Sequence, residues 1–248
     1  FGTLGFIAMR CALFLLGETP RVPVPSNNYL WNPVAHLVVH PWTSFLASTA
    51  SIFLIAWILS LMNSRFNLIR SRSNLPFIVP QFLFSLHPCF LVMTGDYIAL
   101  LLLLLAFFPL LESYQKPESY LYSFRAAVLI GLASLFQAYA LVLLPLWWRG
   151  ERAMRGGQVR SFVASLFGLL LVYVSVFSAY LLLDDIPGFV RPLLCYASFS
   201  VPNIPGYSVA EWGGLLLAAL FFIIHMILAA KIYSRGKVLT LTFMQFAV

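Results

Sequence analysis

Long apolar runs recur along the whole chain and constrain its fold more than any other feature. Each run is about as long as a helix needs to cross a bilayer, which is roughly 20 residues. The runs lie at about 1–17, 43–62, 75–93, 97–113, 126–148, 162–183, 212–230 and 238–248. Only 9% of the 248 residues are charged, whereas a soluble domain carries about 25%. The sequence therefore predicts an all-α polytopic membrane protein.

The run at 126–148 admits two interpretations, and the positive charges of the loops distinguish them. If it were one span, the two sides of the membrane would carry eight and six Lys or Arg residues. If the chain turns back at Gln137, one side carries twelve and the other only Arg21 and Arg191. Membrane proteins concentrate Lys and Arg in their cytoplasmic loops. We therefore predict about seven full spans plus a short broken-helix hairpin, 126–137 followed by 138–148.

The hairpin decides which side of the membrane each loop faces. Its arms are shorter than the roughly 30 Å hydrocarbon core, so the turn must lie within protein or beside water. Gly131 would let the first arm approach a neighbouring helix closely. The predicted cytoplasmic loops are 63–74, 114–125, 149–161 and 231–237. The long loops 18–42 and 184–211 then lie on the outer side.

The loops also limit the domain organisation and the partners. None of them resembles the boundary of a soluble domain, so we expect one transmembrane domain over 1–248. The chain starts at Phe1 and stops inside an apolar run at Val248, and we expect this domain to be incomplete at both ends. The net charge of +7 comes from orienting loops, so the predicted partner is the lipid bilayer and not nucleic acid.

Acidic residues gather on the predicted outer side, and two of them are candidate catalytic groups. Glu18 follows the first run and Asp96 precedes the fourth. Either could act as a general base or bind a metal, or could simply end a span in water. Arg10 interrupts the first run, where a lipid phosphate, a buried ion pair or snorkelling would each explain it. Asp184 and Asp185 either hold a divalent ion or end a helix.

Common motifs of soluble enzymes do not occur. The sequence contains no Walker loop and no GxGxxG, GxSxG or HExxH motif, which argues against an ATPase, a dehydrogenase or a typical hydrolase. The three cysteines are far apart and have no metal-ligand spacing. We assign no metal-binding residues, and the sequence leaves open whether a divalent cation is a cofactor.

Three segments resemble the C-type superfamily of multi-spanning glycosyltransferases, which use polyprenyl-phosphate-linked sugars. FLLGETPR places Glu18 near the start of the first outer loop, and MTGDYIALLLLLLAF places Asp96 before a later span. VLIGLASLFQAYALVLLP fits the broken pair of short helices of that superfamily, with Gln137 where many members have lysine. The resemblance covers most of 1–183 and independently implies the hairpin.

This resemblance implies transfer of a sugar from a polyprenyl-phosphate donor at the extracytoplasmic face. Glu18 would be the general base or a metal ligand, and Asp96 would assist with a metal or position the donor. The groups that would bind lipid phosphate are Arg10, Arg191 and Gln137. The alternative is a non-catalytic membrane subunit or scaffold of a cell-envelope complex, which binds a membrane-protein partner.

A second resemblance concerns location. NLPFIVPQFLFSLHP, followed by the Asp96 run and the GLASLF and LVLLP segments, resembles an uncharacterised family of inner-membrane proteins of Bacteroidota. It implies a multi-pass protein of the bacterial inner membrane and implies no activity.

Overall fold

The structure is a computed structural model, and helices make up almost all of the part of the chain that it describes. It describes residues 2–16, 28–66, 68, 74–114, 120–156, 158–194, 212–217, 219–220, 222–224 and 227. These residues are 87% helical and include no strand. Three helices are long and apolar enough to cross a membrane, namely α3 (Pro41–Phe66), α5 (Gly95–Glu112) and α8 (Val159–Leu182). The predicted all-α class is confirmed for these residues, whereas the number of spans stays a prediction.

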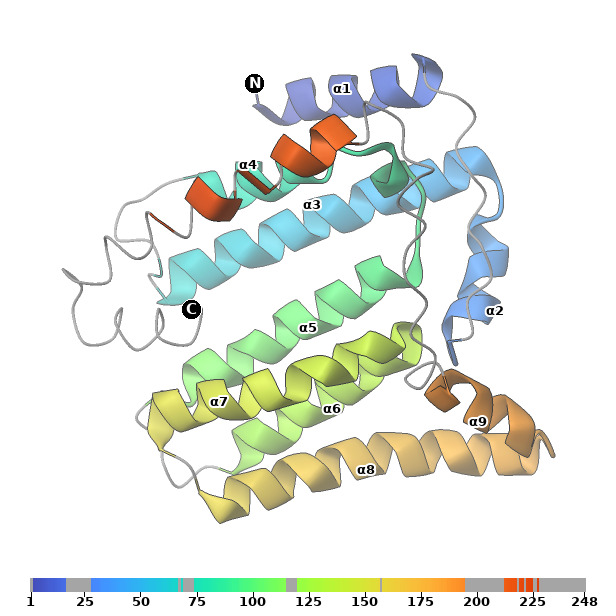
Figure 1. Cartoon of the computed structure of the whole chain (residues 1–248), viewed down its shortest axis with the longest axis vertical. Helices are drawn as coiled ribbons and strands as arrows, with labels where there is room; N and C mark the ends of the chain where they lie inside the picture. The colour runs from blue at the N-terminus through green and yellow to red at the C-terminus, as the bar shows by residue number, and fades with distance from the viewer. Residues whose placement is uncertain are drawn as a thin grey trace. The chain divides into compact units, whose positions relative to one another are not determined.

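The chain divides into two compact units (Figure 1). The first unit consists of Phe1–Pro23, Val38–Met93 and Val201–Val248. The second consists of Val24–Leu37 and Thr94–Ser200. The division describes compactness alone, so the predicted single transmembrane domain is not tested by it.

In the first unit, α1 and two short helices pack on α3. Their bounds are Gly2–Leu16 for α1, Leu75–Leu83 for α4 and Pro88–Leu91 for the 3-10 helix η2. Phe14 of α1, Phe45 of α3 and Leu91 of η2 form a buried cluster. The rings of Phe14 and Phe45 are 4.6 Å apart. Apolar side chains from three separate segments thus hold this unit together.

The prediction of a single helix across 75–93 is wrong. Helix α4 has nine residues, which rise about 14 Å, roughly half of the hydrocarbon core. His87 is extended, with φ −132° and ψ 132°, because the residue before a proline disfavours helical geometry and Pro88 follows. The chain nevertheless runs back from the end of α3 to its start, since the backbone N–H of Met93 donates to Ser44 Oγ at 2.8 Å. The run therefore consists of a short helix, a turn at His87 and a largely irregular segment.

The second unit is built around α6 (Leu121–Phe136), which packs most extensively on α5 and α8 (Figure 1). The other elements of this unit are α2 (Trp31–Ala35), η3 (Ala138–Leu143), α7 (Leu144–Arg155) and α9 (Ile186–Leu194), and η1 (His36–Val38) lies at its boundary. Small residues bring the helices close. A Cβ at Gly131 would lie 3.2 Å from Val172 Cγ2, which confirms the predicted close approach of this arm to a neighbour.

The predicted reversal of the chain at Gln137 is confirmed. Helix α6 ends at Phe136, Gln137 is extended, and η3 and α7 return along α6 (Figure 1). The Ser123 hydroxyl, near the start of α6, donates to the Glu151 carboxylate, near the end of α7. A straight helix would place these two residues about 42 Å apart at 1.5 Å per residue. Which side of a membrane each end faces stays a prediction.

Several predicted loop boundaries are wrong. Helix α3 runs to Phe66, α6 begins within 114–125, and α7 and α8 fill most of 149–161. The outer loop 18–42 contains α2 and η1, and 184–211 contains α9. Hydropathy marks where the apolar residues stop, whereas the helical hydrogen bonds continue through charged residues such as Arg125 and Glu151. The loop 231–237 lies outside the described residues.

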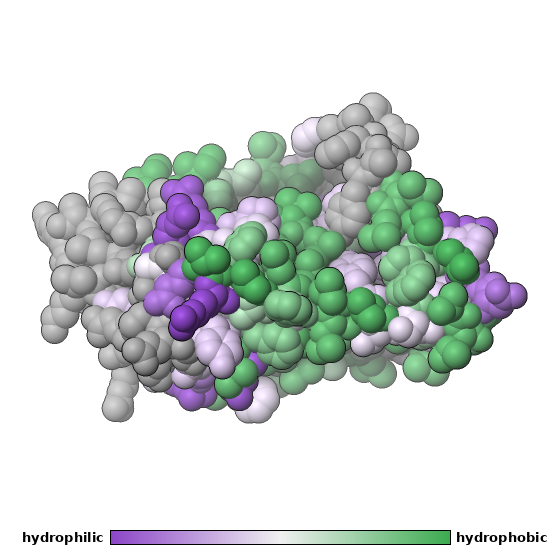
Figure 2. Space-filling view, turned by 90° about the horizontal axis from the view of Figure 1, so that it is seen from below, coloured by the Kyte–Doolittle hydropathy of each residue, from purple (hydrophilic) through white to green (hydrophobic). Residues whose placement is uncertain are grey.

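Helix α8 presents an apolar face to the outside of its unit. Only 17% of its most apolar window is buried, compared with 39% for α3 and for α5. Figure 2 looks onto the side where α8 lies and shows hydrophobic residues across the middle and hydrophilic residues towards the ends. Such an extended apolar surface requires a non-aqueous neighbour, so this face suits a lipid bilayer.

Candidate functional site at Asp96 and Gln137

Asp96 lies in the first turn of α5, and its side chain is exposed. Thr94 is extended and ends the preceding segment, and its hydroxyl donates to Asp96 Oδ2 at 3.1 Å. A carboxylate in this position stabilises the helix, since the N-terminus of a helix carries partial positive charge. The local sequence therefore explains why the residue is acidic. The other carboxylate oxygen, Oδ1, accepts from a residue distant in sequence.

That partner is Gln137, the residue at which α6 ends. Its backbone N–H donates to Ala133 O at 3.0 Å, which closes the helix. Its side-chain amide donates to Asp96 Oδ1 across 41 positions of sequence. An ionised carboxylate only accepts hydrogen bonds, so the donor is the NH₂ group of the glutamine. Two of the predicted site residues are thus in direct contact, and both oxygens of the Asp96 carboxylate are oriented.

Close packing holds the two helix ends together. A Cβ at Gly95 would lie 2.7 Å from Phe136 O and 3.3 Å from the buried Trp31 ring. The backbone N–H of Leu30 donates to Leu135 O at 3.0 Å, which ties the segment before α2 to the end of α6. Glycine is required because no side chain fits between the two backbones. The contact between Asp96 and Gln137 is therefore enforced by the backbones beneath it.

Arg10 lies in the first unit, where its side chain is 0% exposed. Its guanidinium donates to Ser48 Oγ at 2.8 Å and to Thr49 Oγ1 at 3.1 Å on α3. It also donates to two backbone carbonyls, Phe90 O at 2.9 Å and Phe84 O at 3.2 Å. A lipid phosphate could contact this group only if these acceptors moved. Binding of lipid phosphate by Arg10 stays a prediction.

Arg191 and Glu18 are the remaining predicted site residues. Arg191 is exposed in the last turn of α9. Glu18 lies outside the described residues, so its predicted role as a general base stays a prediction. Asp184 and Asp185 end α8 and begin the turn to α9, where Asp185 Oδ1 accepts from the Gly188 N–H at 3.0 Å. Of the two interpretations of this pair, the helix-ending one describes its geometry.

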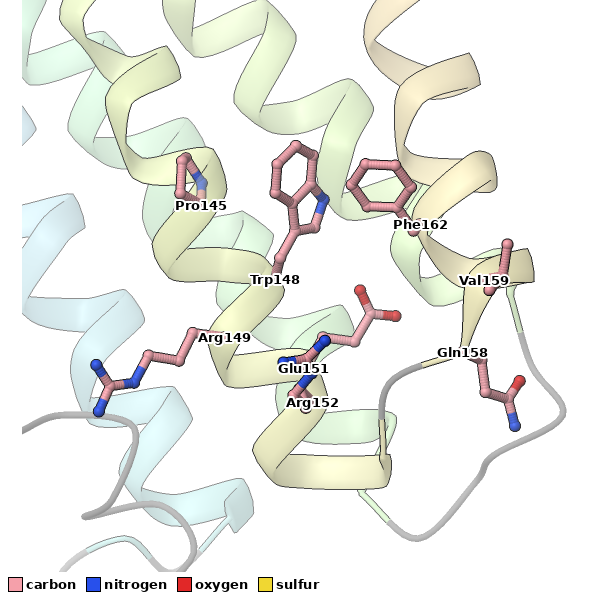
Figure 3. Close-up of a pocket in the computed structure, with 8 residues that line it drawn as sticks. All are labelled: Pro145, Trp148, Arg149, Glu151, Arg152, Gln158, Val159 and Phe162. Carbon is pink, nitrogen blue, oxygen red and sulfur yellow. The ribbon is translucent and has the colours of Figure 1, made fainter.

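The sequence did not point to the groups at the other end of the hairpin. Glu151 is 6% exposed and accepts from Ser123. Beside it, a cavity of about 580 Å³ lies between α7 and the start of α8. Trp148 and Phe162 face each other there, with ring centroids 4.6 Å apart, while the Arg149 side chain points to the other side of α7 (Figure 3). Arg149 and Arg152 nevertheless both contribute atoms to the wall of this cavity.

Signals for these groups were weak. A serine and a glutamate 28 residues apart follow no motif, and only the reversal at Gln137 makes them neighbours. Thr94 could have been recognised, because Thr–Gly–Asp before an apolar run is typical of a helix start. Among the described residues, no three His, Cys, Asp or Glu side chains come together as a metal site.

In comparisons with known proteins, no family model, curated protein or solved structure matches this chain. A functional assignment therefore depends on the residues themselves and on the geometry that the fold gives them.

Proposed function

We propose that this chain is the membrane domain of a multi-pass inner-membrane protein with a glycosyltransferase-like scaffold. It transfers a sugar from a polyprenyl-phosphate donor at the extracytoplasmic end of its helices. The observation that carries this proposal is the direct contact between Asp96 and Gln137. The sequence predicts a catalytic role for Asp96 and a lipid-phosphate-binding role for Gln137, and the folded chain brings the two residues together from different helices.

The proposed topology has about seven crossings plus the hairpin, with the Arg- and Lys-rich loops in the cytoplasm. The segment 75–93 crosses as a short helix followed by irregular chain. It runs antiparallel to α3 and ends beside the start of α3, which supports counting it as one crossing. The later loops therefore keep the sides proposed for them. Irregular backbone at membrane depth is tolerated only where protein or water satisfies it. The contacts of this segment with α3 and α1 supply such cover.

In the proposed reaction, Asp96 is the exposed carboxylate that accepts a hydrogen bond from a substrate hydroxyl or helps to hold a cation. Thr94 and Gln137 fix its orientation through one oxygen each. Glu18 deprotonates the acceptor, and the exposed Arg191 is the cation proposed for the lipid phosphate. A general base contributes about 10²–10⁴-fold to a reaction rate, so loss of such a group is readily measured.

A transfer assay in vesicles tests the proposal. The purified chain is reconstituted and supplied with a panel of polyprenyl-phosphate sugars that are labelled in the sugar. We expect the release of label from one donor to fall at least about tenfold in Asp96→Asn, because a neutral amide no longer accepts or binds as a carboxylate does. Glu18→Gln should abolish transfer.

Asp184→Asn is the matched control, since it makes the same chemical change at another exposed aspartate. Asp184 has a φ of 55°, a conformation that asparagine also tolerates. Its rate should equal that of the unaltered chain. Normal transfer by Asp96→Asn would contradict the proposal. So would a chain that consumes no donor and instead purifies with a stoichiometric membrane partner, which is the result expected of a non-catalytic subunit.

A further inference from the structure

Helix α9 has an apolar face that points away from its own unit. Ile186, Val190 and Leu194 follow one another at intervals of four residues, so they lie along one side of the helix. Their side chains are 46%, 41% and 58% exposed. Pro187, which is also exposed, extends this side. We call these four residues the outer face of α9.

The opposite side of α9 packs on the protein. Phe189 lies against Phe177 of α8, with ring centroids 5.2 Å apart, and against Tyr29 at 5.6 Å. Pro192 is buried. The Tyr29 hydroxyl also donates to Phe189 O at 2.6 Å. The helix is therefore held in a fixed orientation, and the exposure of its outer face follows from that orientation.

Beside α9, the surface of α8 is also apolar and exposed. An apolar groove of about 570 Å³ runs along α8 and ends at Phe189 of α9. Its lining includes Leu170, Val174 and Phe177 of α8. Because α8 is long and apolar enough to cross a membrane and is mostly uncovered, hydrocarbon chains are the natural contents of this groove.

One cation borders the outer face. Arg191 follows Val190 directly and is exposed in the last turn of α9. A long basic side chain at the border of an apolar surface can extend its charge towards lipid phosphates while its stem stays in the apolar layer. An exposed apolar side that ends at a cation suits a helix that lies in a membrane interface, with its inner side packed on the protein.

We infer that α9 is an interfacial helix that lies between the headgroups and the hydrocarbon of the bilayer, next to the end of α8. Phospholipid covers its outer face, and one acyl chain of a bilayer phospholipid occupies the groove below Phe189. This requires that α8 crosses the bilayer, but it does not rest on the proposed transfer activity.

Spin-label accessibility tests this inference on the full chain. Cys11, Cys89 and Cys195 are replaced by serine, and a single nitroxide is attached to a cysteine at Val190 or Leu194. The protein is reconstituted in vesicles of phosphatidylcholine and phosphatidylglycerol. Oxygen, which concentrates in hydrocarbon, and a water-soluble nickel complex report the surroundings of each label. A label at Val174 marks the hydrocarbon, and a label at Gln158, exposed before α8, marks water.

We expect labels at 190 and 194 to be reached by oxygen and protected from nickel, at a depth of about 5–10 Å below the phosphates. Leu194 serves as the second site because its side chain is more exposed than those of Ile186 and Val190. Nickel access equal to that of the label at 158 would overturn the inference. So would protection from both reagents, which indicates a protein cover, or nickel access at 174, which would place α8 outside the bilayer.

Discussion

Arg10 lies within an apolar run and Asp96 lies directly before one, yet the two charged residues have opposite surroundings in the fold. Arg10 is fully buried in the first unit and, among the described residues, donates to Ser48, Thr49 and two backbone carbonyls at 2.8–3.2 Å. Asp96 is exposed in the second unit and accepts from two side chains. A buried charge contributes to stability through its fixed partners, whereas an exposed, oriented charge can still interact with a ligand. The comparison separates a residue that holds the fold from a candidate for chemistry.

The largest effect is expected for Arg10→Met. The change removes a charge but leaves two hydroxyls and two carbonyls without this donor in an enclosed region. We expect the free energy of unfolding to fall by about 3–5 kcal/mol, as when one member of a buried polar network is deleted. Unfolding by sodium dodecyl sulfate in mixed micelles measures it. Arg10→Lys should lose less, because it keeps the charge but not the forked geometry. Equal stability of all three proteins would contradict the buried role.

A smaller loss is expected for Gly95→Ala, which tests how firmly the Asp96 end is built. The new Cβ would lie 2.7 Å from Phe136 O, so α5 and α6 must separate. We expect a loss of about 1–3 kcal/mol, which is typical of overpacking. Gly5→Ala is the control, because a Cβ there meets nothing within 4 Å, and it should not destabilise. Cross-linking of cysteines at 96 and 137 should also slow in Gly95→Ala.

Ser123→Ala weakens the other end of the hairpin. The serine hydroxyl donates to the buried Glu151 carboxylate, and removing one such bond costs about 1 kcal/mol. The same micelle titration measures the change. Ser178→Ala serves as the control, since that exposed hydroxyl donates only locally to Val174 O at 2.8 Å. A loss at Ser123 no larger than at Ser178 would mean that this contact does not hold the arms together.

The smallest effect on stability is expected for Gln137→Ala. Its side chain contacts an exposed carboxylate in a polar region, so we expect a loss of about 0.5 kcal/mol. If the pair serves transfer, the rate should fall by about tenfold while stability hardly changes. A large loss of stability with an unchanged rate would reverse the comparison, because Asp96 and Gln137 would then act as Arg10 does.

Much of the helical architecture followed from the apolar runs and the loop charges. The runs at 43–62, 97–113 and 162–183 correspond to α3, α5 and α8, and the reversal at Gln137 was predicted by counting Lys and Arg. The prediction of one helix over 75–93 was wrong, because hydropathy does not show the extended conformation that Pro88 favours at His87. The predicted positions of several helix ends were also wrong, since a helix can continue through charged residues beyond its apolar part.

The sequence predicted the residues of the candidate site but not their contact. The sequence selected Asp96 and Gln137 separately, with no means of showing that they touch. Their contact depends on the close approach of Gly95 to Phe136 O, which joins backbones distant in sequence. The Ser123–Glu151 contact and the outer face of α9 depend on the fold in the same way.

The sequence by itself determined that most of this chain suits apolar surroundings, because long apolar runs are stable only out of water. It also determined where the chain reverses. Only the tertiary structure decided which polar groups are enclosed and which stay exposed. Burial is a property of neighbours brought together by packing, and neither the composition nor the spacing of a single run contains those neighbours.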